Sequence, residues 1–277
     1  MSERGDALLL RVLYAVAGAA TWLAYRVLGL RRDVIRGNLA RSLPEWTGER
    51  LREVEREFAR RQAELLAELV YSPWLDDAGM RRRLCVDNAE LLADATPDRP
   101  VIVVTGHNGN FEWGIQRVSQ EFGAGVIALY KPQRNERLDR WFRERRSRFG
   151  GRLVPAKDVT QEIARGDVKI VCIVADQVPT SSPRRHWTRF LGQDTAFYMG
   201  PERLARVMRA RVVAGLVQRI ERGRYRIVFE AIAEPGRRLP AGEITERYAR
   251  VLERWIRDDP PGWWWSHRRW KLRRTSD

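Results

Sequence analysis

Cysteine and histidine are scarce in this chain. Its 277 residues include two cysteines, Cys85 and Cys172, and three histidines, His107, His186 and His267. There is no Cys-x-x-Cys pair, so a zinc site is not expected, and the cysteine usage suits a reducing compartment. Walker and dinucleotide-binding glycine patterns are missing as well. The sequence therefore predicts neither a metal nor a cofactor.

Acidic residues are also few relative to basic ones. The chain has 36 Asp and Glu against 51 Lys and Arg, which gives a formal charge of +15 and a pI of about 10.8. Such a balance points to a polyanionic partner: nucleic acid, anionic lipid headgroups or an acidic carrier protein. Hydrophobic residues make up 44%, enough for a proper core. Of the eleven tryptophans, five lie near the C-terminus, between Trp255 and Trp270, where they suit a membrane interface or pack on the core.

Residues 101–113 are the stretch around which the chain is organised. Val101–Val104 is a run of apolar, mostly β-branched residues and predicts a short buried strand. A glycine-containing turn follows and leaves His107 exposed at the strand's C-terminal end. Asn110 is suited to cap a helix over Phe111–Phe122. A strand, a glycine turn and a helix start place a histidine where ligands bind in α/β sheets.

His107 and Glu112 suggest general-base chemistry. If the turn folds back, the Glu112 carboxylate reaches one imidazole nitrogen, fixes the tautomer and leaves the other nitrogen free to take a proton from a hydroxyl. No Ser or Cys stands beside the pair, so the nucleophile would be the substrate's own hydroxyl. Backbone N–H groups at the helix start could face a developing oxyanion. The alternative is a loop histidine that caps a helix.

The remaining pattern predicts an α/β fold in which a mixed central sheet is flanked by helices. Pro179–Thr188 is expected to be a polar loop. Further strands are expected at Gly125–Tyr130, Lys169–Ala175, Val212–Ile220 and Tyr225–Ile232, and further helices at Asp33–Ser42, Gly48–Tyr71, Asn88–Ala95, Tyr198–Met208 and Glu243–Arg257.

The N-terminal segment is the most apolar part of the chain. Ala7–Leu30 is interrupted by two arginines and followed by Arg31 and Arg32. We expect residues 1–32 to form a membrane anchor, spanning or interfacial, with a buried amphipathic helix as the alternative. Residues 33–277 would then form a single domain on the cytoplasmic side, because basic residues follow the anchor.

Two polar groups beyond the central stretch are candidates for substrate contact. Asp176 and Gln177 follow a buried strand, so they either contact substrate or cap a turn. A helix that opens at Asn135 is very basic and has few acids to pair with, which favours a surface for phosphates or an acidic partner over a merely solvated face. Its arginines are Arg137, Arg140, Arg143, Arg145, Arg146 and Arg148.

Several motifs carry a family resemblance. His-Asn-Gly-Asn-Phe-Glu at 107–112 resembles the His-x4-Asp/Glu motif of glycerolipid acyltransferases, in the form found in the bacterial lipid A biosynthesis (late) acyltransferase family. Other matching elements run in order from Arg36 to Lys271: Arg-x-Asn-Leu at 36–39, Tyr-Lys-Pro-Gln-Arg-Asn at 130–135, Asp-Gln at 176–177, Phe-x-Gly at 190–192 and Trp-x-His-Arg-Arg-Trp-Lys at 265–271.

The resemblance implies a glycerolphosphate-acyltransferase-like fold and an O-acyltransferase at the cytoplasmic face of the bacterial inner membrane. The acyl donor in this family is usually acyl carrier protein, which is acidic, and the acceptor would be a lipid A precursor. His107 would be the general base and Glu112 its orienting partner. The C-terminal arginines would face lipid phosphates near the membrane. Residues implied in substrate binding are Asn110, Arg146 with Arg148 as its alternative, Asp176 and Gln177.

Two alternatives remain open at this point. The loop after Asp176 and Gln177 departs from the best-known lipid A enzymes, so the chain could be a lysophospholipid acyltransferase that uses acyl-CoA or acyl carrier protein, or could acylate another glycolipid. A membrane-peripheral protein that binds nucleic acid is the non-enzymatic alternative, since charge and aromatic residues permit it. No RNA-recognition or helix-turn-helix pattern supports that alternative, and no nucleic-acid partner is expected.

Overall fold

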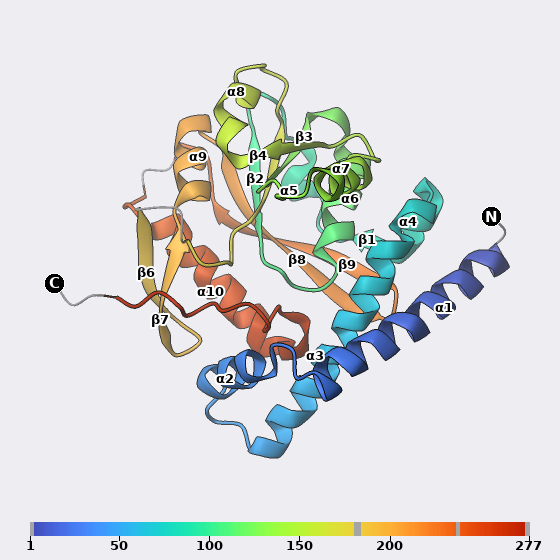
Figure 1. Cartoon of the computed structure of the whole chain (residues 1–277). Helices are drawn as coiled ribbons and strands as arrows, with labels where there is room; N and C mark the ends of the chain where they lie inside the picture. The colour runs from blue at the N-terminus through green and yellow to red at the C-terminus, as the bar shows by residue number, and fades with distance from the viewer. Residues whose placement is uncertain (1–2, 180–183, 237–238, 275–277) are drawn as a thin grey trace.

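The centre of the computed structural model, which describes residues 3–179, 184–236 and 239–274, is a seven-stranded mixed sheet (Figure 1). Its strand order is β1-β9-β8-β2-β5-β3-β4. The strands are β1 (Leu84–Val86), β2 (Val101–Thr105), β3 (Val126–Tyr130), β4 (Arg152–Pro155), β5 (Ile170–Val174), β8 (Arg211–Glu221) and β9 (Arg224–Ala233), and a separate hairpin is formed by β6 (Arg185–Phe190) and β7 (Gln193–Tyr198).

Helices flank the sheet on both faces (Figure 1). The α-helices are α1 (Glu3–Trp22), α2 (Arg32–Ser42), α3 (Gly48–Tyr71), α4 (Asp77–Arg83), α5 (Glu90–Ala93), α6 (Phe111–Phe122), α7 (Glu136–Arg146), α8 (Val159–Ile163), α9 (Gly200–Met208) and α10 (Glu243–Asp258). Short helical turns are η1 (Leu23–Val27), η2 (Ser72–Trp74), η3 (Gly123–Gly125), η4 (Ala156–Asp158) and η5 (Pro260–Gly262).

Strand β2 lies in the middle of the sheet, and every one of its residues is buried. Successive side chains point to opposite faces of a strand. Ile102 and Val104 accordingly pack into the core with α10, whereas Val101 and Val103 pack into the core with α6. A strand that is covered on both sides reads as a continuous apolar run, which is why residues 101–104 could be recognised without alternation.

The register of the sheet determines which loops meet. β2 pairs in parallel with β5, although β3 comes between them in the chain, and Thr105 lies opposite Val174. The residues that follow these two strands therefore emerge side by side at the carboxyl edge of the sheet. β9 runs antiparallel to β8 and makes the sheet mixed, as the sequence predicts.

The loop expected at Pro179–Thr188 is wrong for its second half. Residues 180–183 lie outside the described part of the chain, but Arg185–Phe190 forms β6 and pairs with β7. The polar side chains of β6 made this segment read as a loop in the sequence, but two of them bind α10: His186 and Thr188 both contact the Glu246 carboxylate. The short strands β1 and β4 were not expected either.

Helix α1 lies along α3 and leaves one side open (Figure 1). Leu10 and Ala17 are buried, and Ala17 packs against Ala63 and Ala67 of α3. Ala7–Val27 is the one stretch of the described residues that is long and apolar enough to cross a membrane. The exposed large apolar side chains of the N-terminal segment are Leu8, Val12, Val16, Trp22, Leu23, Val27, Leu28 and Leu30.

Candidate functional site

The carboxyl edge of the sheet brings His107 and Asp176 together. His107 follows β2, Asp176 follows β5, and the imidazole Nδ1 lies 2.6 Å from Asp176 Oδ1. The backbone N–H of His107 also donates to Asp176 Oδ2, at 2.8 Å. Gly106 makes this approach possible, since a Cβ there would lie 3.1 Å from Asp176 Oδ2 and 2.9 Å from Leu252.

Gly109 is required by the same turn. Its φ of +53° is in the left-handed region that favours glycine, and a Cβ would collide with the carbonyl oxygen of Val217 in β8. The backbone N–H of Gly109 donates to the carbonyl of Gly262, at 3.0 Å. The turn is therefore held against the C-terminal segment.

Asp176 is a buried, ionised carboxylate. It is 2% exposed, and burial by itself would raise its pKa. The positive charge that His107 carries when it is protonated, together with the hydrogen bonds from His107 and from the Trp263 indole, outweighs burial and lowers the pKa of Asp176 to about 2. A carboxylate only accepts, so the proton on the neutral imidazole sits on Nδ1.

The other imidazole nitrogen is available as a base. Gln177 Nε2 lies 3.1 Å from His107 Nε2, and an amide nitrogen only donates, so Nε2 of His107 accepts. The Gln177 side chain is exposed, and the His107 side chain is 17% exposed. A substrate hydroxyl that displaces the Gln177 amide would meet the lone pair of Nε2.

The expected contact between Glu112 and His107 is wrong. Both ring nitrogens of His107 have other partners, and Glu112 instead accepts a two-pronged ion pair from Arg146 of α7, with Arg146 Nε 2.6 Å from Glu112 Oε2 and Arg146 Nη2 on Glu112 Oε1. Glu112 lies in the first turn of α6 and fixes the guanidinium there. Asp176, expected to contact substrate, is the residue that orients the imidazole.

Asn110 and Arg148 have internal partners. Asn110 caps α6, as predicted, through its Oδ1, which accepts from the Trp113 N–H at 3.0 Å. The Asn110 side chain is buried, so the structure does not offer it to a substrate. Arg148 donates to the carbonyls of Ser72 and Leu75, at 2.6 and 2.9 Å, and so holds η2, whereas Arg146 pairs with Glu112 at the start of α6.

The C-terminal segment contributes two tryptophans to the site. Sequence analysis did not predict these contacts. The Trp263 indole donates to Asp176 Oδ2 at 2.8 Å, and Trp264 packs edge-on against His107, with ring centroids 5.5 Å apart. Phe111 packs on the same imidazole at 4.8 Å. The tryptophan-rich motif was visible in the sequence, but no spacing rule connects residue 263 to residue 176.

The membrane role expected for this segment is wrong for three of its residues, whereas Arg268 and Lys271 are exposed. Trp263 and Trp265 are buried in the core and do not face outward. Arg269 is buried as well: it donates to the carbonyl of Ala196 and stacks over the Phe197 ring, so it does not face lipid phosphates. Burial lowers the pKa of Arg269 to about 10.

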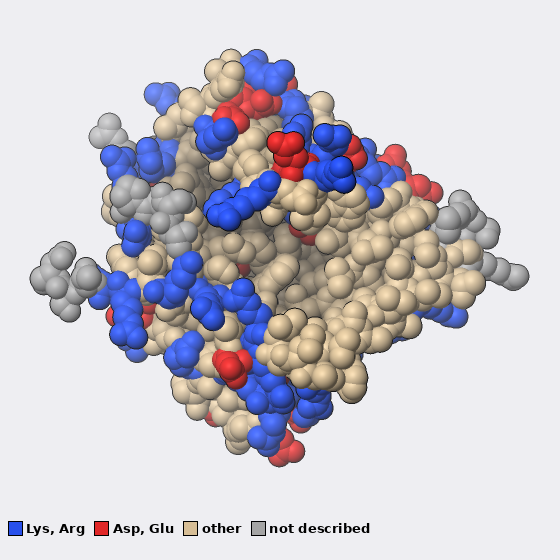
Figure 2. Space-filling model, in the orientation of Figure 1, with Lys and Arg blue, Asp and Glu red and all other residues tan. Residues whose placement is uncertain are grey.

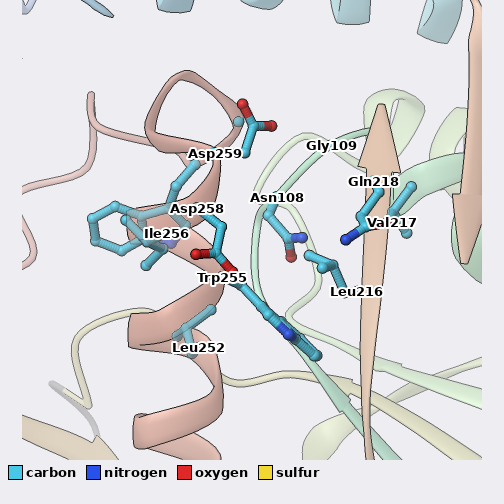
Figure 3. A pocket seen from close by; sticks show the side chains of 12 residues that line it. Asn108, Gly109, Leu216, Val217, Gln218, Leu252, Trp255, Ile256, Asp258 and Asp259 are labelled. Atoms are coloured by element: carbon cyan, nitrogen blue, oxygen red, sulfur yellow. The ribbon is translucent and has the colours of Figure 1, made fainter. Parts of the chain in front are cut away.

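A small cavity lies behind the turn. Figure 3 shows the Asn108 side chain pointing into it, between β8 and the C-terminal end of α10. The cavity has a volume of about 40 Å³, and Asn108 is 6% exposed with neither amide atom hydrogen-bonded to the described residues. This volume holds a water molecule, which would satisfy the amide and support the turn.

The face of the molecule near the turn is hollowed (Figure 2). Lys and Arg side chains gather along the rim of the hollow, and the surface over α1 is almost free of charge in this view. Helix α7, which lies at the upper part of this face in Figure 1, has no buried residue. A polyanionic substrate and an apolar chain would both find complementary surface here.

The geometry defines a class of site. A histidine that is oriented by a buried carboxylate, and whose second ring nitrogen contacts an exposed amide that a hydroxyl could replace, has the arrangement of a general-base site. The described hydrogen bonds of His107 involve no serine or cysteine, so a substrate hydroxyl is the group that it would activate.

Comparison with known proteins gives the family. The profile described as "Bacterial lipid A biosynthesis acyltransferase" matches residues 9–272, nearly the whole chain, and the protein belongs to this family. It is thus an enzyme of an acyltransferase family whose members are membrane-associated and whose description points to a lipid acceptor. No curated protein matches the chain by sequence. The resemblance inferred from the motifs is confirmed.

Proposed function

We propose that the protein transfers a fatty acyl chain from an acyl thioester, carried by acyl carrier protein, to a hydroxyl of a lipid A precursor or a related membrane glycolipid. The observation that carries this proposal is the arrangement of His107 between Asp176 and Gln177, because it leaves Nε2 as an acceptor whose partner, the Gln177 amide, is exposed. The family match supports the acyl group and the lipid acceptor.

The reaction follows from the tautomer. His107 Nε2 removes the proton of the acceptor hydroxyl while its oxygen attacks the thioester carbonyl carbon, and the negative charge of Asp176 stabilises the imidazolium that forms. The tetrahedral intermediate collapses with cleavage of the C–S bond, and the imidazolium returns its proton to the leaving thiolate. The Trp113 N–H is taken by the Asn110 cap, so the N–H groups of Phe111 and Glu112, which a helix start leaves without an intrahelical acceptor, are the ones proposed to face the oxyanion.

Arg146 is the residue proposed to bind an anionic headgroup. Glu112 holds the guanidinium at two points, so the arginine is fixed before substrate arrives. Arg and phosphate form two-pronged contacts that an ammonium group does not reproduce. Glu112 therefore serves the reaction by placing Arg146, and Gln177 contacts the acceptor hydroxyl or its neighbours.

The donor would dock on α7 and the loop before it. Among the described residues, the exposed basic side chains there for which no ion pair is found are Lys131, Arg134, Arg137, Arg140 and Arg143, and the half-buried Arg145 lies over the Trp141 ring. An acidic carrier protein is complementary to the exposed side chains. Charge reversal at Arg137 and Arg140 should raise the KM for the carrier thioester more than the KM for acyl-CoA.

The N-terminal helix is proposed to attach the enzyme to the cytoplasmic face of the inner membrane. One side of α1 is occupied by α3, and the other presents Leu8, Val12 and Val16 to the outside. A helix with one packed and one apolar exposed side fits an interfacial position better than a spanning one. Residues 33–277 are proposed to form the single catalytic domain.

The test offers two donors, acyl carrier protein thioester and acyl-CoA, to two acceptors, a lipid A precursor and a lysophospholipid, and measures product mass. We expect the carrier thioester and the lipid A precursor to react fastest. The His107→Ala variant should fold and attach to membranes but lose transfer. Near-normal transfer by that variant would refute His107 as the general base. Faster transfer to the lysophospholipid would show that a lysophospholipid, and not a lipid A precursor, is the acceptor.

A further inference from the structure

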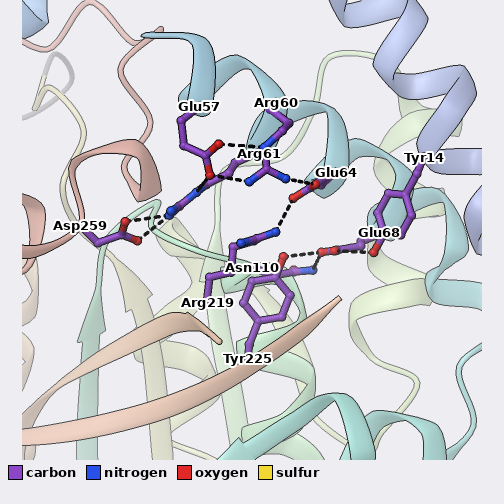
Figure 4. A network of polar contacts seen from close by, with 10 residues as sticks. All are labelled: Tyr14, Glu57, Arg60, Arg61, Glu64, Glu68, Asn110, Arg219, Tyr225 and Asp259. Carbon is purple, nitrogen blue, oxygen red and sulfur yellow. Dashed lines mark hydrogen bonds and ion pairs between the residues drawn. The ribbon is translucent and has the colours of Figure 1, made fainter. Parts of the chain in front are cut away.

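Helix α3 carries a buried carboxylate that receives donors from three different elements (Figure 4). Glu68 is 0% exposed. Its Oε1 accepts from the hydroxyl of Tyr14 in α1 at 2.9 Å. Its Oε2 accepts from the hydroxyl of Tyr225 in β9 at 2.8 Å and from Asn110 Nδ2 at 2.7 Å. All three donors are neutral, so no cation compensates the carboxylate directly.

Such a group is costly, which makes its presence informative. Burial raises the pKa of Glu68 to about 7, although the hydrogen bonds from Tyr225, Tyr14 and Asn110 act in the opposite direction. An apolar side chain would fill the same volume without the cost of removing a charge from water. What the carboxylate adds is two acceptor atoms that join α1, β9 and α6 at one point.

Asn110 connects Glu68 to the turn at residues 106–110, which contains His107 and is called the catalytic turn below. Its Nδ2 binds Glu68, and its Oδ1 accepts from the Trp113 N–H, so both ends of the amide are used. The Trp113 indole donates to Ser72 Oγ at 2.8 Å, which ties α6 a second time to the end of α3. The first turn of α6, which also holds Glu112, is therefore oriented from α3.

Tyr14 brings the N-terminal helix into the same network. The side of α1 that carries Tyr14 also carries Leu10 and Ala17, which are buried beside it. Movement of α1 away from α3 would break the Tyr14 hydrogen bond and leave one carboxylate oxygen of Glu68 without its donor. The seating of the proposed membrane helix and the order of the catalytic turn thus share one side chain.

We propose that Glu68 is a positioning residue for acyl transfer, and that Tyr14 makes the geometry of the catalytic turn depend on the seating of α1 against α3. This inference rests on the proposed function, because it concerns the same site. It gives α1 a second role beyond attachment: the enzyme reaches full turnover only when α1 is in place, which favours reaction at the membrane surface.

The variants separate hydrogen bonding from packing. Glu68→Gln should stay within about twofold of the wild-type kcat, since its amide oxygen accepts from Tyr225 and Asn110 and its NH2 group donates to the Tyr14 hydroxyl. Glu68→Leu removes all three contacts and should lower kcat by about tenfold or more, and Tyr14→Phe by several-fold, with KM unchanged. Leu10→Ala is the matched control, because it weakens α1 packing without touching Glu68.

The measurements use the full-length protein in detergent micelles, with the carrier thioester and lipid A precursor as substrates. Hydrogen exchange of the Trp113 amide is recorded alongside kcat and melting temperature, and it reports order in the turn even if the wild type transfers no acyl group. We expect Leu10→Ala to lower the melting temperature but keep kcat and Trp113 protection, and Tyr14→Phe to lower kcat and Trp113 protection.

Two results would overturn the inference. The first is that Tyr14→Phe and Glu68→Leu both keep the kcat and the Trp113 amide protection of the wild type. The other is an equal loss of kcat in Leu10→Ala and Tyr14→Phe, which would mean that α1 acts by packing alone. If Glu68→Leu does not fold, the comparison of Tyr14→Phe with Leu10→Ala and the retained activity of Glu68→Gln still decide the matter. If the wild type transfers no acyl group, the proposed function is rejected, but hydrogen exchange of the Trp113 amide still tests whether Tyr14 and Glu68 order the turn.

Discussion

The substitution Asp176→Asn is the sharpest perturbation of the proposed mechanism, because it changes one atom at a buried position. Asp176 Oδ2 accepts two N–H donors, from the backbone of His107 and from the Trp263 indole, both at 2.8 Å. The amide oxygen of the variant would take that place. Its NH2 group would then face His107 Nδ1, and the imidazole would have to carry its proton on Nε2, where the base is needed.

The expected fall in kcat of Asp176→Asn follows from the lost charge as well as from the changed tautomer. The imidazolium formed during transfer would lose a partner whose oxygen lies 2.6 Å from Nδ1. Two unit charges about 4 Å apart interact by about 4 kcal/mol at an effective dielectric constant of about 20. Each 1.4 kcal/mol is about tenfold in rate, so kcat should fall by about a thousandfold. The hydrogen-bonded shape is kept, and the variant should remain folded.

The assay is single-turnover acyl transfer with the carrier thioester and lipid A precursor at saturating concentrations, with product detected by mass. The matched control is Asp167→Asn, the same chemical change at an exposed carboxylate that pairs with Arg152. We expect wild-type rates in the control. A rate for Asp176→Asn within tenfold of wild type would refute the assignment of Asp176 as the residue that orients His107.

Three further outcomes concern other parts of the molecule. Glu112→Gln should raise the KM of the lipid acceptor and lower kcat by about tenfold, since Arg146 loses its two-pronged partner; an unchanged KM would contradict headgroup binding by Arg146. Val12→Asp with Val16→Asp should release the protein from vesicles while it stays folded, because both side chains are exposed on α1; retention on vesicles would reject attachment by this side. Burial lowers the pKa of His267 to about 4, so the native state binds fewer protons than the unfolded state, and stability that is complete above about pH 6.5 should decline as pH falls toward 4. The loss is at most about 3 kcal/mol and about half that after solvent screening, and the free energy of unfolding of His267→Gln should vary less between pH 7 and 5; equal slopes would contradict it.

Local signals were sufficient for the elements that hold the site. The apolar run at Val101–Val104, the cap at Asn110 and the helix over Phe111–Phe122 are all present, with β2 extending to Thr105. Each depends on neighbours in the chain: a strand covered on both faces, a side-chain oxygen for the free N–H groups of a helix start, and an apolar stripe. Each of these elements is recognised from a pattern of a few consecutive residues, although the contacts that cover β2 come from α6 and α10.

The carboxylate that contacts His107 could not be predicted from local sequence patterns. Both Glu112 and Asp176 were visible, and proximity in sequence favoured Glu112. The strand order decides otherwise, because β5 and not β3 lies next to β2, and this places Asp176 at the same sheet edge as the imidazole. Strand order is a property of the whole sheet and leaves no mark in the residues beside the motif.

Asp176 contacts His107 and Glu112 contacts Arg146, and these different partners give a reason for two carboxylates in one site. Asp176 is buried beneath the imidazole, where a low pKa keeps it ionised and its charge is available to the imidazolium in the transition state. Glu112 stands on the helix start and holds a guanidinium, so its charge is already compensated before substrate binds. One carboxylate of either kind could not do both, because a charge shared between Arg146 and His107 would stabilise the imidazolium less. The spacing of the His-x4-Glu motif therefore puts Glu112 in the first turn of α6, where it holds Arg146, and the proposed base His107 takes its own carboxylate from the residue after the neighbouring strand, β5.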